Sequence, residues 1–365
     1  MSVLAFGNDI EEKALVGDVE AQLLLARRCD AHGNGEKAVE WLRRAAATGD
    51  LAAKTELGRH LLSDPPYNQR EGVKWTMDAA GEGSGEAAHL LAVLAASGVC
   101  VGQSWRDALA KLQRSAELGL TLAQAELAML AENREIPGAL AAGDEFPQET
   151  WERLRRSVDI RKWLVVPQAK LVSKSPRLAI VEKFASAEIC DWLIERGRLH
   201  LRPARTDDPA TGKSRYETAR TNSSAELDLS QTDLITHLVR ARISALTGPP
   251  VMAMEGTAVL HYAVGQQYFP HFDFFDTDSP GYARQVAEFG QRVLTFLCYL
   301  NDGYGGGETD FPAIGWRYKG NKGDALFFWN IQPNGQPDRL TQHAGLAPTS
   351  GEKWLLSQWV RGRVS

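Results

Sequence analysis

Three side chains in the last third of the sequence have the types and spacing to bind a metal ion. His271 and Asp273 lie two positions apart within the aromatic stretch YFPHFDFF, and His343 follows farther along the chain. Side chains alternate between the two faces of a β-strand, so His271 and Asp273 share one face and the flanking phenylalanines share the other. The octapeptide by itself fits a metal site and a structural histidine before a turn equally well.

Two histidines and one aspartate on separate strands of a barrel form the ligand set of non-haem Fe(II) oxygenases, which leaves three coordination positions open. Open positions are needed to bind a chelating co-substrate and dioxygen. The first five histidines lie in helical or loop segments without an acidic partner at strand spacing. His261, beside Tyr262 on a predicted strand, is expected to be exposed or to support a ligand. His343 therefore remains as the second histidine ligand.

Lys353 lies ten positions after His343, within the apolar stretch KWLLSQW. A buried lysine needs an anionic partner. A dicarboxylate such as 2-oxoglutarate supplies one, because its keto acid end can chelate a metal while the far carboxylate makes a charge-assisted bond with Lys353. Taken alone, Lys353 also fits an edge lysine that extends its amine into solvent. Combined with the two histidines and the aspartate, it favours the anion site.

Short β-rich runs from about residue 165 onward must position these side chains. They are separated by Gly, Pro, Asn and Asp turns and include RLAIVEKF, TAVLHYAV, RVLTFLCYL, DALFFWN and KWLLSQWV. Two helices are predicted, at about 186–198 with Ser186 as N-cap and at about 230–246. Many short strands with two early helices predict a jelly-roll, or double-stranded β-helix, barrel with helices packed outside. The polar loop 202–218 is either a mobile lid or a solvated loop.

The first third of the sequence repeats one pattern of small and apolar residues four times. In each copy a glycine can end one helix, and an alanine and a leucine then line one face of the next helix. Trp41 and Trp75 each lie eight residues before the glycine of their copy. The period is typical of helix-turn-helix solenoids. The four copies are Ala14, Gly17, Ala21, Leu25; Ala46, Gly49, Ala53, Leu57; Ala80, Gly83, Ala87, Leu91; and Ala116, Gly119, Ala123, Leu127.

These repeats resemble the tetratricopeptide superfamily, in particular its Sel-like branch, over roughly residues 10–132. We therefore expect a helical repeat domain at 1–132, a linker and connecting helix at 133–164, and a barrel domain at 165–365. Solenoids present concave surfaces to partners. The repeat domain is accordingly expected to bind a protein partner or a second copy of the chain, and to carry no catalytic residue.

Composition narrows the remaining function classes. The chain has 365 residues, 44% hydrophobic residues and a formal net charge of −5, so no global positive field attracts nucleic acid. The amino-terminal stretch has acidic residues too early for a signal peptide, and no apolar run approaches the length of a membrane span. We expect a cytoplasmic protein. The four cysteines are widely scattered, which favours reduced, mostly buried thiols.

From about 178 to 361 the sequence resembles the prolyl 4-hydroxylase type of Fe(II)/2-oxoglutarate dioxygenase. The motifs HYAVGQQYFPHFDFF, RVLTFLCYLNDGYGGGETDFP, KGDALFFWN and QHAGLAPTSGEKWLLSQWV occur in the family's order. By position, the resemblance implies three groups of site residues: His271, Asp273 and His343 as iron ligands; Lys353, Tyr262 and Thr295 in the 2-oxoglutarate pocket; and Arg220 and Trp359 toward the substrate, with packing as the other role of Trp359. The stretch ARTNSSAEL inserts Asn222 where the family runs from Thr to Ser, which leaves the substrate open.

The resemblance implies hydroxylation of proline or a related residue, in a peptide, a protein or a free amino acid. The expected cofactors are Fe(II), 2-oxoglutarate and O2, with ascorbate to keep iron reduced, and the products include succinate and CO2. No protein general base is required, and no catalytic residue is expected beyond the iron ligands. The alternatives are oxidation of another small molecule in biosynthesis, an inactive barrel on a solenoid scaffold, and a zinc-dependent cupin.

Overall fold

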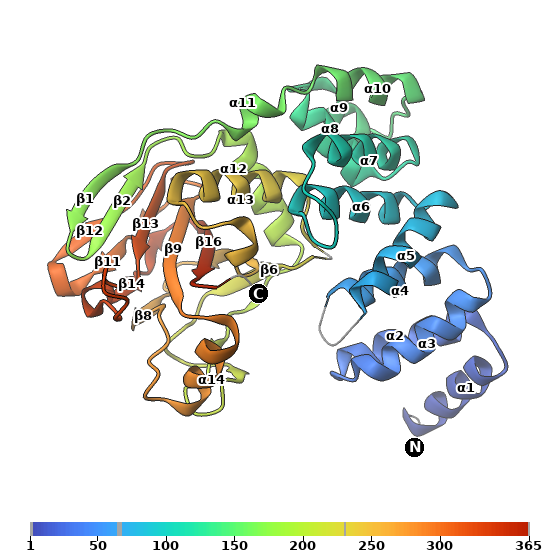
Figure 1. Ribbon diagram of the computed structural model, residues 1–365, viewed down its shortest axis with the longest axis horizontal. Helices are drawn as coiled ribbons and strands as arrows, with labels where there is room; N and C mark the ends of the chain where they lie inside the picture. Colours follow the sequence, from blue (N-terminus) through green and yellow to red (C-terminus); the bar gives the residue numbers. More distant parts are fainter. Residues whose placement is uncertain (1–2, 64–67, 230, 364–365) are drawn as a thin grey trace. The chain divides into compact units, whose positions relative to one another are not determined.

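The computed structural model describes residues 3–63, 68–229 and 231–363 and divides the chain into two compact units. The first unit takes in Met1–Trp163 and Leu229–His237, and the second takes in Leu164–Asp228 and Leu238–Ser365. In Figure 1 the first unit is helical, from blue to green, and the strands of the second run from green to red. No helix within the described residues is long and apolar enough to span a bilayer.

Four helical pairs form the repeat region, as the sequence pattern predicts. Gly17, Gly49, Gly83 and Gly119 all have positive φ, between 86° and 104°, a conformation that lets a glycine end a helix. The alanines that follow these glycines are buried, and Ala53, Ala87 and Ala123 are fully enclosed. The helices are α1 (Val3–Leu15), α2 (Val19–Ala31), α3 (Gly35–Ala47), α4 (Leu51–Ser63), α5 (Gln69–Gly81), α6 (Gly85–Ser97), α7 (Trp105–Glu117) and α8 (Thr121–Leu130).

Residues 133–163 pack onto the repeats, although the sequence predicts a linker with one helix there. They form the short helix α9 (Glu135–Ala141) and α10 (Gln148–Ser157), and α11 (Ile160–Leu164) follows. Trp151 is only 1% exposed, and the Trp163 indole donates to the Leu130 carbonyl at 3.0 Å. Pro137 and Gly138 lie within α9, whereas Gly143 and Pro147 lie between α9 and α10, so these residues do not prevent helices here.

One wall of the helical unit contains a groove of about 940 Å³. It is lined mainly by α2, α4, α6 and the start of α8, together with Leu229 and Thr232 of the second segment of this unit. Inside it, Arg27 and Glu56 form an ion pair at 3.0 Å. Positively charged, negatively charged and apolar side chains all line the groove, so it is neither uniformly charged nor uniformly apolar.

The second unit is built around two main antiparallel sheets, as a double-stranded β-helix requires (Figure 1), and has two further two-stranded sheets. The larger sheet has the strand order β1-β2-β13-β9-β16-β7-β6-β3, and the smaller has the order β12-β11-β14-β8. The strands of the larger sheet are β1 (Lys170–Lys174), β2 (Arg177–Val181), β13 (Ala325–Trp329), β9 (Arg292–Tyr299), β16 (Lys353–Arg361), β7 (Thr257–Tyr262), β6 (Ser223–Leu227) and β3 (Arg202–Pro203). Those of the smaller sheet are β12 (Trp316–Tyr318), β11 (Thr309–Phe311), β14 (His343–Gly345) and β8 (Tyr268–His271).

Strand alternation separates the two faces of the larger sheet. On β9, Leu297 and Tyr299 belong to the core that also contains Phe311 of the smaller sheet, whereas Phe296 packs against Phe184 with ring centroids 4.7 Å apart. Helix α12 (Ala187–Arg198) begins at the predicted N-cap, where the Ser186 hydroxyl accepts from the Ile189 amide. It approaches β7 so closely that a Cβ on Gly197 would meet Val259 at 2.5 Å. The second predicted helix is α13 (Leu234–Thr247).

The loop 202–218 packs against a helix that the sequence does not predict, α14 (Pro280–Phe289). The Tyr282 hydroxyl donates to the Asp207 carbonyl at 2.9 Å, and the Gly281 amide donates to the Pro209 carbonyl at 2.9 Å. Within the loop, β4 (Thr206–Asp207) pairs with β5 (Ser214–Arg215). This loop is therefore an ordered part of the barrel rim, anchored on α14, and not a bare solvated connection.

Candidate metal and co-substrate site

The three predicted metal ligands converge at one edge of the smaller sheet. His271 ends β8 and His343 begins β14, and the two residues face each other directly in the strand register. The His271 Nε2 lies 3.7 Å from Asp273 Oδ1, and the His343 Nε2 lies 3.5 Å from Asp273 Oδ2. One ligand atom from each residue fits within 4.8 Å of the others, the spacing that a single metal ion needs.

Asp273 reaches this cluster from a bend and not from a strand. The sequence predicts that His271 and Asp273 share one face of a continuous strand, but β8 ends at His271. The chain bends after Phe272, and Asp273 is 5% exposed. The two side chains still converge, because the bend turns the carboxylate back toward the histidines.

Both histidines are held in the tautomer that binds a metal through Nε2. The His271 Nδ1 lies 2.8 Å from the Phe269 carbonyl, and the His343 Nδ1 lies 3.0 Å from the Thr341 carbonyl. A carbonyl oxygen only accepts, so each Nδ1 carries the proton and each Nε2 presents its lone pair. In both cases the acceptor is the carbonyl two residues earlier in the chain.

The electrostatics of the cluster favour a neutral His271 and an ionised Asp273 at neutral pH. Burial, supported by the neighbouring His343, lowers the pKa of His271 to about 3. Burial alone would raise the pKa of Asp273, but the two histidines, Arg292 and the Thr295 hydroxyl outweigh it and lower the pKa to about 2. His271 and Asp273 are thus in the protonation state that binds a metal, without a proton having to leave first.

Lys353 lies at the start of β16, inside the space between the two sheets. The side chain is fully buried, and Nζ has no hydrogen-bond partner among the residues that the structure describes. Nζ lies 5.0 Å from the Tyr262 ring centroid and 5.8 Å from that of Tyr299. Burial lowers the pKa of Lys353 to about 7. A buried amine without a partner is the complement of a carboxylate, which fits the distal end of 2-oxoglutarate.

Tyr262 lies beside Lys353, as the resemblance implies. The two residues are partners in the register of β7 and β16, and Tyr262 is 3% exposed. Burial raises the pKa of Tyr262 to about 12, so its hydroxyl keeps its proton and can donate to a carboxylate.

Thr295, which the resemblance places in the 2-oxoglutarate pocket, is not among the residues that line the cavity and lies behind Asp273. Its hydroxyl donates to Asp273 Oδ2 at 2.7 Å. The inward-facing residue of β9 near Lys353 is Tyr299, four positions later, or about 13 Å along a strand. The Tyr299 hydroxyl pairs with Thr309 Oγ1 at 2.8 Å. The sequence reasoning missed this second threonine, although Thr309 lies within the motif GGETDFP and borders the cavity.

Arg220 and Trp359, which the resemblance places toward the substrate, both border the cavity. The Arg220 guanidinium lies 4.8 Å from the Tyr268 ring centroid and is oriented by Asn222, whose Oδ1 accepts from Nε at 3.2 Å. The inserted Asn222 is thus a buried support for Arg220. Trp359 packs against the Arg292 guanidinium at 4.1 Å, and its indole N–H has no partner within the described part of the chain.

The cavity between these side chains holds about 30 Å³. The cavity is lined chiefly by the three metal-ligand candidates, by Tyr262, Thr309 and Lys353, and by Arg220, Tyr268 and Trp359.

Comparison with known proteins places this geometry in a family. Residues 257–361 match the model of the 2OG-Fe(II) oxygenase superfamily. A probable prolyl 4-hydroxylase of Arabidopsis thaliana is 34% identical over 211 residues, which cover 53% of this chain and 71% of that protein. The prolyl 4-hydroxylase subunit alpha-1 of Gallus gallus is 34% identical over 188 residues, which cover 52% of this chain and 36% of that subunit.

Two solved structures are similar to separate parts of the chain. A viral collagen prolyl hydroxylase from Paramecium Bursaria Chlorella virus-1, solved with 2-oxoglutarate, shares 26% identity over 51% of this chain and 96% of its own, with a TM-score of 0.38. A Sel1 repeat protein from Oxalobacter formigenes shares 21% identity over 41% of this chain and 62% of its own, with a TM-score of 0.28.

The family model covers residues 257–361, which contain His271, Asp273, His343 and Lys353. The sequence matches support a dioxygenase over the zinc cupin and the inactive scaffold as descriptions of this barrel. The chain belongs to the prolyl 4-hydroxylase family of 2OG-Fe(II) oxygenases, and it is a dioxygenase that uses Fe(II), 2-oxoglutarate and O2.

Proposed function

We propose that this enzyme hydroxylates proline or a related residue in a peptide, a protein or a free amino acid. The family supports the reaction type, since its curated relatives are prolyl 4-hydroxylases. The observation that carries the proposal is the pairing of a three-residue metal cluster with the buried, unpartnered Nζ of Lys353 in one cavity. The cluster has the ligands for a metal ion, and the buried Lys353 amine can pair with a carboxylate of a dicarboxylate.

In the proposed mechanism His271, Asp273 and His343 hold Fe(II) through three protein bonds. When bound, Fe(II), 2-oxoglutarate and O2 supply the oxidising chemistry, in which one oxygen atom enters a substrate C–H bond and the other enters succinate as CO2 leaves. Lys353 orients the co-substrate by holding its distal carboxylate. The side chains that border the cavity position one substrate C–H bond and exclude water. This positioning is the main contribution of the protein to the reaction.

We propose that Arg220 and Trp359 contact the substrate. Both border the cavity beside the metal cluster, and the Trp359 indole N–H is an unused donor among the described residues. Arg220 can donate to backbone carbonyls of a peptide or to the carboxylate of a free amino acid. The groove of the helical unit supports docking of a protein partner, and that partner is either the substrate protein or a second copy of the chain.

Product mass tests the proposed reaction directly. The full-length protein with Fe(II), 2-oxoglutarate, O2 and ascorbate is expected to add one oxygen atom to proline-containing peptides or to free cyclic amino acids. Mass spectrometry of the products, with fragmentation to locate the oxygen, checks this result. Oxygen on another residue type, or stoichiometric succinate with no oxidised proline compound in a broad panel, would replace this proposal with oxidation of another small molecule.

The lowered pKa of Lys353 predicts that 2-oxoglutarate binding takes up a proton above neutral pH. Without the anion the pKa is about 7, so at higher pH the free amine is neutral and must be protonated to pair with the carboxylate. Affinity is therefore expected to be flat below about pH 7 and to fall by up to about tenfold for each pH unit above it. Anaerobic calorimetry on the metal-loaded protein, repeated in buffers of different ionisation enthalpy, measures both the affinity and the proton uptake.

Lys353→Arg is the matched control for this pH dependence. A guanidinium stays protonated over the whole range, so this variant is expected to bind more weakly but with little dependence on pH. Wild-type affinity that stays constant up to about pH 9, with no proton uptake, would contradict a neutral Lys353 in the free enzyme.

A further inference from the structure

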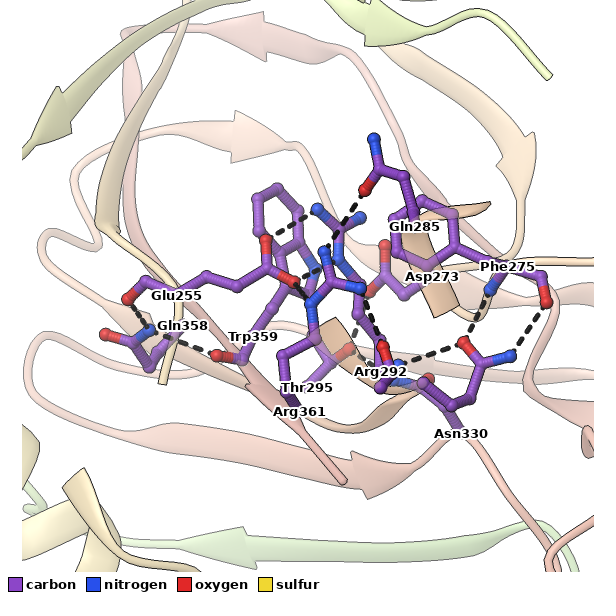
Figure 2. Close-up of polar contacts among 12 residues, drawn as sticks. Glu255, Asp273, Phe275, Gln285, Arg292, Thr295, Asn330, Gln358, Trp359 and Arg361 are labelled. Carbon is purple, nitrogen blue, oxygen red and sulfur yellow. Dashed lines mark hydrogen bonds and ion pairs between the residues drawn. The ribbon is translucent and has the colours of Figure 1, made fainter. Parts of the chain in front are cut away.

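Asp273 is held by a chain of two hydrogen bonds that leads away from the cavity. The Thr295 hydroxyl donates to Asp273 Oδ2 at 2.7 Å, and the Asn330 side-chain amide donates to Thr295 Oγ1 at 2.9 Å (Figure 2). Thr295 and Asn330 are fully buried, and Asp273 is 5% exposed. Water therefore has little access to these bonds, and the three side chains define one another's orientation.

The proton of the Thr295 hydroxyl is committed to the carboxylate. An ionised carboxylate only accepts, and an amide NH2 group only donates. With Asn330 Nδ2 facing it, the hydroxyl accepts from the amide and has its single proton left for Asp273. The opposite orientation of the Asn330 amide would place two acceptors against one proton, so the network selects the orientation observed.

From this arrangement we propose that Thr295 and Asn330 are positioning residues, which hold Asp273 so that it gives the metal one oxygen and not two. This inference rests on the proposed metal ligand set. Oδ2 accepts the Thr295 proton, and the proposal assigns the other oxygen, Oδ1, to the metal. Chelation through both oxygens would occupy a further coordination position, and the co-substrate and O2 need the positions that remain.

The backbone around Asp273 needs side-chain hydrogen bonds to fix its position. Since β8 ends at His271, the residues after it have no strand partner to fix them. Gln291 takes the place of a strand partner at Phe275, two residues after Asp273. Its Oε1 accepts from the Phe275 amide at 2.7 Å, and its Nε2 donates to the Phe275 carbonyl at 2.7 Å. This clamp fixes the backbone, and Thr295 then fixes the carboxylate at its end.

Thr295→Val tests the inference, because valine keeps the shape of threonine and removes the hydroxyl. Loss of a buried partner of a metal ligand is expected to weaken metal binding by about ten- to a hundredfold. Titration of the full-length protein with Co(II) or Mn(II), without 2-oxoglutarate, measures this affinity. Thr295→Ser keeps the donor and should bind metal within about threefold of wild type. At saturating metal the KM for 2-oxoglutarate should change by less than about twofold in Thr295→Val.

Two further variants separate this role from a merely structural one. Asn330→Asp replaces the amide donor with an acceptor, so it should weaken metal binding in the same direction even if the valine variant folds poorly. Thr309→Val removes a hydroxyl at the Lys353 end of the same cavity, and it should leave metal affinity unchanged. Thermal melting of the metal-free proteins verifies that each variant is folded.

The outcomes distinguish this inference from the proposed function. Wild-type metal affinity in Thr295→Val and Asn330→Asp, with Asp273→Ala unable to bind metal, would overturn the positioning role and leave the ligand set intact. A raised KM for 2-oxoglutarate with unchanged metal affinity would place Thr295 against the co-substrate instead. Metal binding that survives in Asp273→Ala would overturn the ligand set itself.

Discussion

Alanine in place of His271, Asp273 or His343 is expected to lower turnover by at least about a thousandfold while leaving the fold intact. Each side chain supplies one of only three protein bonds to the metal, so its loss also lowers the iron content of the purified protein. Succinate formation at saturating Fe(II) and elemental analysis after desalting measure the two effects. The cluster lies at the cavity edge and carries little of the core, so thermal melting of the metal-free variants should remain close to that of the wild type.

His261→Ala provides the matched control for the triad. His261 is the nearest histidine in the sequence, but on β7 it pairs with Glu352 at 2.9 Å and lies outside the metal cluster. Its loss is expected to leave iron content unchanged and turnover within a fewfold of wild type. An Asp273→Ala protein that turns over near the wild-type rate with iron fully loaded would show that Asp273 is not a ligand.

Lys353→Ala is expected to raise the KM for 2-oxoglutarate by about ten- to a hundredfold, with iron affinity nearly unchanged. A buried charge-assisted contact contributes about 1.5–3 kcal/mol, which corresponds to that range. Nζ has no acceptor among the described residues, so removing it leaves no protein acceptor without its hydrogen bond. A titration of succinate formation with 2-oxoglutarate, at saturating metal, measures the effect.

Lys353→Met controls for the space that the lysine side chain fills. It removes the charge but keeps a long unbranched chain in the fully buried position, so it should show the same KM without creating a cavity. Lys353→Arg should restore part of the affinity, since the charge remains but the planar guanidinium fits the space poorly. Equal KM values for wild type and Lys353→Ala would remove the anion-anchoring role and leave the buried amine without an assigned function.

Much of the architecture could be predicted because it depends on local spacing. Gly17 and its three equivalents have positive φ in the structure, as expected of residues that end helices before a buried alanine. The strand runs, the helix that begins after Ser186 and the convergence of His271 with His343 also follow from pattern. Each of these features is set by neighbours a few residues apart or by a motif of fixed length.

Features that depend on contacts between distant segments were not predictable in the same way. Residues 133–163 form helices because Trp151 finds a buried site on the repeats, and no local pattern reveals that site. Leu229–His237 belongs to the helical unit although the barrel surrounds it in the sequence. The end of β8 at His271 is likewise set by its pairing with β14.

The sequence by itself determined which chemical groups this protein has for its reaction: two imidazoles, a carboxylate and a lysine in an apolar strand. Only the tertiary structure decided which end of the cavity each neighbouring side chain serves. Thr295 and Tyr299 face the same side of β9, and alternation cannot tell them apart. The register of β9 with β16 does so, because it pairs Thr295 with Trp359 and brings Tyr299 toward Lys353. Thr295 therefore donates to Asp273, the proposed metal ligand, whereas Lys353, Tyr262 and Tyr299 lie together at the end proposed to bind the anion.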